Sequence, residues 1–286
     1  MKKSYDINNP MPPLWLKYPH KGMYSIGWRM GYGEEYKCEF GDWYNTLNPE
    51  EQKNYQQMFP EPKGWLGWYE EDSNDKDIYD DDGYLLWNED GKMKYSIEDL
   101  KKDFQKGKSI KYLFFWGHQP SHDGSITKTC LSQWWKSDFT IETDTYCCME
   151  QYMMAEKARL FEDDEILNEI MESKNPKQIK ELGRKVKNFN EKVWEQKRYS
   201  IILNGNYAKF IQNERLKEFL LGAKNRVLVE ASPYDKIWGI GMSSDDEHIN
   251  NPLEWKGLNL LGFALMEVRD ELLRVCENEK ILNCED

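Results

Sequence analysis

The stretch "CMEQYMMAEKARLFED", residues 148–163, limits the possible folds more than any other part of the chain. It contains no Pro or Gly and is rich in strong helix formers, so it predicts a helix. At ~100° per residue, one side of this helix carries Glu150, Met153, Met154, Lys157 and Phe161. A glutamate and a lysine therefore lie in a stripe that should be buried. Either their stems pack while their charged heads reach water, or the helix lines a cavity in which both heads act.

Composition excludes several classes of protein. The chain has 286 residues, of which 39% are hydrophobic and 31% charged, which is typical of a folded globular protein with one large or two smaller domains. No apolar segment is long enough to span a membrane, and the first residues lack the apolar core of a signal peptide. Six scattered cysteines form no CxxC pair. We therefore expect reduced thiols and a cytoplasmic location.

The net charge of −12 argues against general binding of duplex nucleic acid, because such binding depends on cationic contacts to phosphates. A local basic patch around a small phosphorylated ligand is still allowed. The candidates for such a patch are Lys157, Arg184 and Lys209. Gly183 directly precedes Arg184, and a glycine there allows a ligand to approach the backbone closely.

Aromatic residues, Gly and Pro are concentrated before about residue 105, where half of the 12 Trp lie. Because no Gly/Ser-rich linker follows, we expect residues 1–105 to form an aromatic-rich N-terminal extension that packs on a main domain at residues 110–280. The segment "EEDSNDKDIYDDDG", residues 70–83, predicts a solvated acidic loop and lacks the EF-hand pattern.

The predicted fold class is α+β with helix dominant. Apolar runs predict strands at residues 110–117 and 225–232. Residues that can cap helix N-termini are Ser96, Asn175, Asn190 and Asn213. Together with the apolar periodicity, these caps predict helices at residues 96–107, 148–163, 176–189, 191–212, 214–222 and 257–276.

Several stretches place polar groups among aromatic side chains, where the predicted strands end and in "LSQWW". The residues concerned are Trp116, Ser132, Gln133, Trp134, Glu230, Asp235 and Trp238. Such groups could form a pocket that stacks a flat ring and binds charge beside it. The other interpretation is that each Trp packs in the core. The residues alone leave both open.

Six features together carry a family resemblance. They are "CMEQYMMAEKARLF", "KELGRKV", Trp194, "KFIQN", "LVEASPYDKIWGIG" and "GLNLLGFALMEVRDEL". In this order they resemble the NADAR family of YbiA-like N-glycosidases, from about Phe114 to Leu273. The resemblance implies a compact α+β domain with a ligand cleft, and cleavage of an N-glycosidic bond between a ribose and a base. The N-terminal hundred residues resemble an extension of some longer members.

The resemblance also assigns residues. The family's glutamate and lysine match Glu150 and Lys157, and its Glu–Asp–Trp–Gly segment matches Glu230, Asp235, Trp238 and Gly239. The family's Ser-Asn-Phe stretch appears here as Ser132, Gln133 and Trp134, a departure that puts in doubt any contact made by the Asn amide. The residues we expect to contact substrate are Trp116, Ser132, Gln133, Trp134, Lys157, Arg184, Trp194, Glu230, Trp238, Gly239 and Asn259.

Breaking a ribosyl–nitrogen bond develops positive charge on the sugar, which a carboxylate in an apolar setting stabilises. Glu150 fits that role. Asp235 is the second carboxyl we expect to be catalytic, with Glu230 as a reserve. Lys157 could compensate the charge or hold a phosphate, and Trp116, Trp134 or Trp238 could stack on the base. The chemistry requires no metal or redox cofactor.

The resemblance implies either a ribosylated pyrimidine intermediate or ADP-ribosylated guanine as the substrate, and we expect ADP-ribosylated guanine, in single-stranded nucleic acid or as a smaller nucleoside adduct. Stacking surface from up to three Trp favours a purine, and the acidity of the chain disfavours duplex DNA. The alternatives are a ribosylaminopyrimidine phosphate of riboflavin synthesis, a module that binds ADP-ribose or a nucleotide without cleaving it, and an interaction protein whose Trp-rich N-terminal segment binds a partner.

Overall fold

The computed structural model describes residues 5–70, 79–80, 83–88 and 92–282. Most of the predicted acidic loop at residues 70–83 lies outside the described residues. Among the residues that the structure describes, no helix is both long enough and apolar enough to cross a membrane.

The chain divides into two compact units. The first consists of Met1–Leu85, Thr140–Asp144 and Glu271–Asp286. The second consists of Leu86–Phe139 and Thr145–Asp270, and it contains the residues that the sequence singles out for chemistry.

The first unit packs short helices on an aromatic core. Its helices are α1 (Leu14–Lys17), η1 (Ile26–Trp28), α2 (Gly31–Tyr44), α3 (Pro49–Met58) and η2 (Lys63–Trp65). Trp15, Trp28, Trp43 and Trp65 are all buried in this core, and the rings of Trp15 and Trp65 lie 5.4 Å apart. Buried indoles stabilise a core and offer no surface to a partner, so these four tryptophans act in packing.

The second unit is α+β with helix dominant, as predicted. Its helices are α4 (Ile97–Gln105), η4 (Lys128–Leu131), α5 (Met149–Leu160), α6 (Asp164–Glu172), α7 (Pro176–Gly183), α8 (Glu191–Ile211), α9 (Glu214–Gly222) and η5 (Pro252–Glu254). Elements with residues in both units are α10 (Leu260–Val275), β2 (Phe139–Ile141) and β3 (Asp144–Tyr146), and η6 (Glu279–Ile281) belongs to the first unit.

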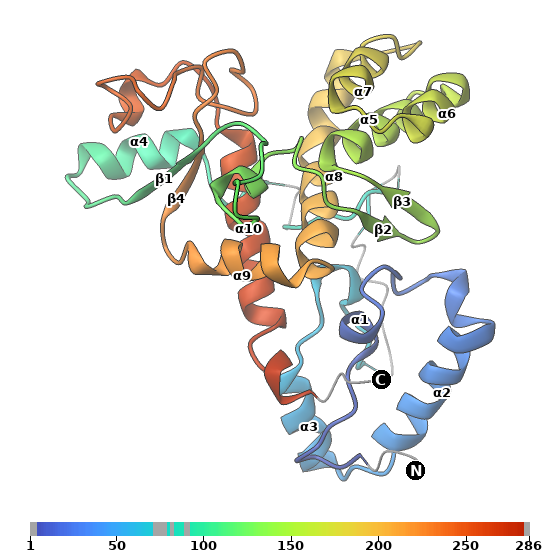
Figure 1. Ribbon diagram of the computed structural model, residues 1–286. Coiled ribbons are helices and arrows are strands. Elements are labelled where there is room, and N and C mark those ends of the chain that lie inside the picture. Colours follow the sequence, from blue (N-terminus) through green and yellow to red (C-terminus); the bar gives the residue numbers. More distant parts are fainter. Residues whose placement is uncertain (1–4, 71–78, 81–82, 89–91, 283–286) are drawn as a thin grey trace. The chain divides into compact units, whose positions relative to one another are not determined.

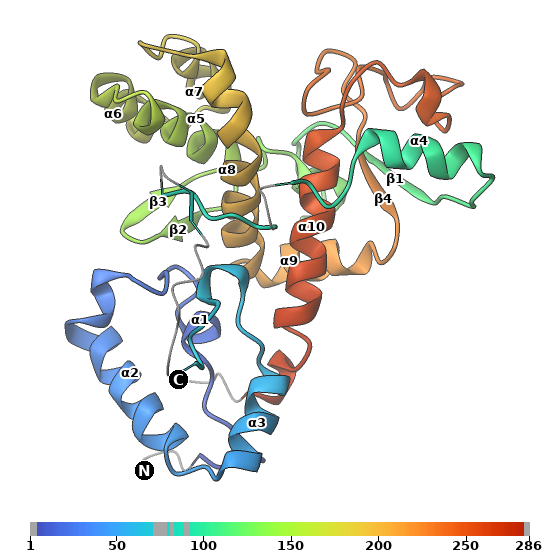
Figure 2. The same ribbon diagram turned by 180° about the vertical axis from the view of Figure 1, so that it is seen from behind.

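The two predicted strands pair in parallel. β1 (Tyr112–Phe115) lies beside β4 (Val227–Glu230), with Phe115 opposite Glu230 (Figures 1 and 2). Parallel strands need a crossover connection, and here it contains α5 to α9. Because the carboxyl ends of parallel strands share one edge, the chain after Phe115 and the chain after Glu230 leave the pair on the same side.

Helix α5 is the centre of a helical cluster. It packs against α6, α7 and α8, and the four helices lie together in both views (Figures 1 and 2). Met149, Met153 and Met154 are buried in this packing. The cluster fixes the first turn of α5, which carries Glu150.

Two helices end earlier than the apolar pattern predicts. Helix α5 ends at Leu160 because Glu162 has a left-handed φ of 55°, and Asp163 then caps α6. Helix α7 ends at Gly183, with Arg184 as its C-cap, instead of continuing to residue 189. Isolated left-handed residues end a helix without changing its apolar period, so the sequence pattern does not report them.

Gly205 sets how closely α8 approaches α5. A Cβ at this position would lie 2.3 Å from Cδ1 of Tyr152 and 2.7 Å from Cε of Met149. Gly205→Ala is therefore expected to lower the free energy of unfolding by about 1–3 kcal/mol through overpacking. Urea denaturation followed by far-UV circular dichroism measures this change. Gly222→Ala is the matched control, because a Cβ there meets no atom within 4 Å; equal stability of the two variants would contradict the tight contact.

Candidate active site

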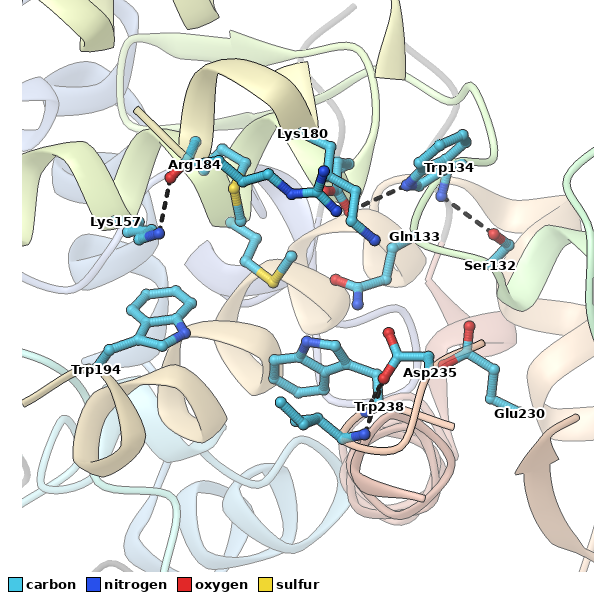
Figure 3. Close-up of a pocket in the computed structure, with 15 residues that line it drawn as sticks. Ser132, Gln133, Trp134, Lys157, Lys180, Arg184, Trp194, Glu230, Asp235 and Trp238 are labelled. Atoms are coloured by element: carbon cyan, nitrogen blue, oxygen red, sulfur yellow. Dashed lines mark hydrogen bonds between the residues drawn. The ribbon is translucent and has the colours of Figure 1, made fainter. Parts of the chain in front are cut away.

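A cavity of about 340 Å³ lies in the second unit, within the size range of small-molecule sites. Its walls come from the loop after η4, from α5 and α7, from the start of α8 and from the loop after β4 (Figure 3). The lining residues are Ser132, Gln133, Trp134, Glu150, Met153, Met154, Lys157, Lys180, Gly183, Arg184, Trp194, Glu230, Asp235, Ile237 and Trp238. The face of α5 that carries Glu150 and Lys157 thus lines a cavity, as in the second of the two interpretations of residues 148–163.

Glu150 is the most buried acid of the cavity, with 3% of its surface exposed. Its backbone N–H donates to the carbonyl of Gln133 at 2.9 Å, and Nε1 of Trp134 donates to Oε2 at 3.1 Å. Oε1 of Glu150 is buried and has no hydrogen-bond partner among the residues that the structure describes. A buried carboxylate oxygen without a partner is costly, and it is an acceptor available to a ligand.

Burial raises the pKa of Glu150 to about 7. Lys180 and the Trp134 hydrogen bond act in the opposite direction, Asp235 raises the pKa further, and Arg184 lowers it. Near neutral pH this carboxyl is therefore close to half ionised in the empty site. A positive charge developing beside it would favour the ionised form.

Glu230 ends β4 and also lines the cavity. Burial raises its pKa to about 8, and the charges of Asp235 and Glu150 add to this while Lys180 opposes it. Its Oε2 is buried, and no described residue forms a hydrogen bond with it. At neutral pH Glu230 is mainly a neutral carboxylic acid that can donate a proton.

The loop after Glu230 is held by its own side chains. Oδ1 of Asp235 accepts hydrogen bonds from the backbone N–H groups of Ile237 and Trp238, at 2.9 Å and 2.8 Å. Gly239 must lack a side chain, because a Cβ would lie 2.8 Å from the carbonyl oxygen of Glu230. This turn places Asp235, Ile237 and Trp238 in the wall of the cavity.

Cations form another part of the wall. Figure 3 shows Lys180 and Arg184 on one side of the view, with Asp235 and Glu230 on the other. Both cations come from α7 and its C-cap, one helical turn apart. Nζ of Lys157 donates to the carbonyl of Gly183 at 2.7 Å, and burial lowers its pKa. These charges suit a ligand that carries phosphate.

Aromatic rings lie among the charges. Nζ of Lys157 is 5.9 Å from the ring centroid of Trp194, and Nζ of Lys180 is 5.8 Å from that of Trp134. In Figure 3, Trp238 lies between Trp194 at one end of the cavity and Trp134 at the other. The cavity therefore offers flat apolar surface next to anionic and cationic groups, which suits a ligand with a ring and a charged sugar phosphate.

Most of the residues singled out from the sequence meet in this cavity. Those that line it are Ser132, Gln133, Trp134, Glu150, Lys157, Arg184, Trp194, Glu230, Asp235 and Trp238. Three others do not. Trp116 is 47% exposed and contacts Tyr234, and Gly239 shapes the backbone of the loop. Asn259 is fully buried, where Oδ1 accepts from the N–H of Glu230 and Nδ2 donates to the carbonyl of Leu228.

Lys209 lies outside the lining and has a different task from the one expected. It is fully buried in α8, and Nζ donates to the carbonyls of Cys130 and Ser132 at 2.7 Å and 3.2 Å. Burial lowers its pKa to about 8. Lys209 therefore fastens the loop that carries Ser132, and it is not available to a phosphate.

Sequence reasoning missed Lys180 and Ile237. Lys180 precedes Arg184 by four residues on a predicted helix, and this spacing puts two residues on one face. That signal could have found Lys180 once Arg184 was chosen. Ile237 had no comparable signal. Among the described residues, no three His, Cys, Asp or Glu side chains are grouped so that they could hold a metal ion.

The raised pKa of Glu230 predicts a pH dependence of stability. In the unfolded chain its pKa returns to about 4.5, so the folded state binds more protons between pH 4.5 and about 8. Stability from this group is present at low pH and is lost as the pH rises through that window, by at most about 1.4 kcal/mol per pH unit. Urea midpoints at pH 5 to 8 should fall more steeply for the wild type than for Glu230→Gln. Parallel curves would show that Glu230 does not titrate as the geometry requires.

Comparison with known proteins gives a consistent picture. The model of the NADAR domain family matches residues 114–273. An N-glycosidase of Acanthamoeba polyphaga mimivirus is 42% identical over 167 residues, which are 56% of this chain and 96% of that protein. The chloroplastic riboflavin biosynthesis protein PYRR of Zea mays is 33% identical over 136 residues, 45% of this chain but 20% of that protein. The NMR structure of YbiA from E. coli has a TM-score of 0.46 and 26% identity, covering 58% of this chain and 86% of that one.

Proposed function

The chain belongs to the NADAR domain family, and from this premise we propose that it is an N-glycosidase that hydrolyses the bond between a ribose and a base. The mimiviral relative, almost all of which the alignment covers, is named an N-glycosidase. The observation that carries the proposal is Glu150, a buried acid whose Oε1 is left without a partner inside a cavity of suitable size.

Glu150 is the group that stabilises the transition state. As the bond from the anomeric carbon to the base nitrogen lengthens, the sugar becomes oxocarbenium-like and positively charged. The carboxylate of Glu150 stabilises this charge because burial excludes water that would screen it. The oxygen of a water molecule then bonds to the anomeric carbon. The proton that this water releases makes up for the proton that the leaving base has taken up.

The leaving base needs a proton donor. Asp235 is the second catalytic carboxyl of the proposal, and Glu230 lies close enough for the two charges to interact. Because the pKa of Glu230 is about 8, it carries a proton at neutral pH and can supply one to the base directly or through Asp235. Glu150 has two further neighbours that lower its pKa, the Trp134 hydrogen bond and Arg184, which do not act on Glu230.

Substrate binding is assigned to the remaining lining residues. Lys157 and Arg184 hold the phosphate nearest the ribose, and Lys180 extends this cationic wall toward Glu150. Trp134, Trp194 and Trp238 are available to stack on the base or sugar.

At the finer level we favour ADP-ribosylated guanine as the substrate, as a nucleoside adduct or in single-stranded nucleic acid. Three tryptophans line the cavity, more stacking surface than a small pyrimidine needs. Cationic side chains in the wall suit a diphosphate, and the net charge of −12 disfavours a duplex.

A ribosylaminopyrimidine phosphate is the second candidate, because the relative from Zea mays is named for riboflavin biosynthesis. Comparing turnover of ADP-ribosyl-guanosine and of this pyrimidine under one set of conditions separates the two. Release of guanine-containing product from the first, with little cleavage of the second, is expected. Cleavage of the pyrimidine alone would overturn the finer assignment, and tight binding of ADP-ribose without cleavage of either would indicate a binding module.

A further inference from the structure

A second cavity, of about 490 Å³, lies in the same unit as the candidate active site. Its lining residues are His118, Gln119, Pro120, Trp135, Lys136, Lys174, Asn175 and Pro176. We call it the flanking cavity.

The flanking cavity is built from the same chain segments as the active-site cavity. Trp134 lines the active-site cavity, and the next residue, Trp135, lines the flanking one. Helix α7 begins with Pro176 in the flanking cavity and ends with Gly183 in the active-site cavity. The ring of His118 packs on the ring of Trp134, with centroids 5.3 Å apart. This tilted ring contact joins a lining residue of the flanking cavity to a lining residue of the active-site cavity.

The charge of the flanking cavity is opposite to that of the chain. Asp and Glu outnumber Lys and Arg by 51 to 39 in the whole sequence, yet the lining contains two lysines and no carboxylate. Lys136 and Lys174 are both exposed, and neither forms an ion pair with any residue that the structure describes. Two unpaired cations without a nearby lining acid make a local attraction for an anion.

We propose that the flanking cavity binds a phosphate group of the substrate that lies beyond the ribosyl–base unit. Lysine ammonium groups bind phosphate as point charges, and the side chains of His118 and Gln119 add hydrogen-bond donors. Pro120, Trp135 and Pro176 supply apolar surface for the sugar or ring attached to that phosphate. The inference rests on the proposed N-glycosidase function, which it deepens by extending the substrate past the reacting bond.

Two parts of a substrate could supply this phosphate: the diphosphate of an ADP-ribosyl group, or the phosphodiester next to the modified base in a nucleic-acid strand. Three substrates separate these sources. They are a ribosyl adduct of guanosine that has the same scissile bond but no phosphate, ADP-ribosyl-guanosine, and the same ADP-ribosyl adduct in a single-stranded oligonucleotide.

The test compares the wild type with Lys136→Met/Lys174→Met on all three substrates. If the diphosphate is bound, KM for both ADP-ribosyl adducts should rise about tenfold, with kcat little changed. If the phosphodiester is bound, only KM for the oligonucleotide should rise, and the wild-type advantage should shrink as salt increases. The ribosyl adduct without phosphate should be unaffected in either case.

Lys101→Met/Lys106→Met removes the same charge from α4 and is the matched control. If the two double variants have equal effects, the change in KM comes from the net charge of the chain, and the inference is overturned. Unchanged KM values for both ADP-ribosyl adducts would also overturn it. If the wild type cleaves none of the substrates, the proposed function falls. In that case, calorimetry with the same variants still tests whether the flanking cavity binds phosphate. The ligands are ADP-ribose and a single-stranded oligonucleotide. Unchanged affinity for both ligands overturns the inference, and weakened binding of either supports it.

Discussion

Replacing Glu150 by Gln should reduce turnover at least about a hundredfold, the scale expected when one preorganised electrostatic group is removed. Gln has nearly the same shape and can still accept the hydrogen bond that Trp134 donates to Oε2. Removing a carboxyl that burial disfavours in its charged form should leave the fold intact. The measurement is kcat for release of free base, with the melting temperature recorded for the same sample.

Glu191→Gln is the control for this change, because Glu191 is an exposed acid of α8 outside the cavity lining. It should retain wild-type turnover. A Glu150→Gln enzyme that keeps most of its turnover would remove Glu150 from the mechanism, whatever its stability.

Lys180→Met should change the pH profile as well as the rate. Among charged neighbours, Lys180 opposes the burial of Glu150 most strongly, so its loss raises the pKa of Glu150 above about 7. A shift of about one pKa unit lowers the ionised fraction, and with it kcat/KM, roughly tenfold below the pKa. The acid limb of the profile should move to higher pH, and the alkaline limb, which Glu230 sets, should move the same way, because Lys180 also lowers the pKa of Glu230.

Lys180→Arg keeps the charge and should leave the acid limb close to that of the wild type. A uniform loss of kcat/KM at every pH in Lys180→Met would assign Lys180 to substrate binding alone. An unchanged profile would show that its charge does not act on Glu150.

Strands β1 and β4 and helices α4, α5, α7, α8, α9 and α10 could be predicted because their signals are local, whereas the parallel pairing of the strands is a long-range contact that the sequence does not predict. Asn175 and Asn190 cap α7 and α8 with their side chains, as placed from the sequence, and the stripe of α5 follows the period of 3.6. The same period placed Glu150 and Lys157 on one face, and both line the cavity. The resemblance to the NADAR family is confirmed by the family model.

Other features depend on three-dimensional contacts. Trp116 follows the buried Phe115, and side chains alternate along an extended chain, so Trp116 faces away and is exposed. Asn259 has a left-handed φ of 55°, and both polar atoms of its buried amide form hydrogen bonds with β4. The spacing of residues in the sequence does not indicate these contacts. Lys209 is buried and donates its hydrogen bonds to backbone carbonyls. Lysine is rarely buried in this way, so the residue type predicts an exposed side chain.

The role of the N-terminal extension stays a prediction. Four of its tryptophans, Trp15, Trp28, Trp43 and Trp65, form a core within the first unit, whereas Trp87 belongs to the second unit. Packing of residues 1–105 on the later domain is still expected from the absence of a flexible linker near residue 105.

The most direct test of the central claim is a product analysis by liquid chromatography and mass spectrometry of ADP-ribosyl-guanosine incubated with the purified chain. An N-glycosidase must release the guanine nucleoside and free ADP-ribose in equal amounts, at a rate that depends on enzyme concentration and is lost in Glu150→Gln. The riboflavin-pathway ribosylaminopyrimidine phosphate is analysed in parallel, for its free base and sugar phosphate. If the first substrate yields no guanine nucleoside and the second no free base above the level of the Glu150→Gln enzyme, the N-glycosidase account is contradicted.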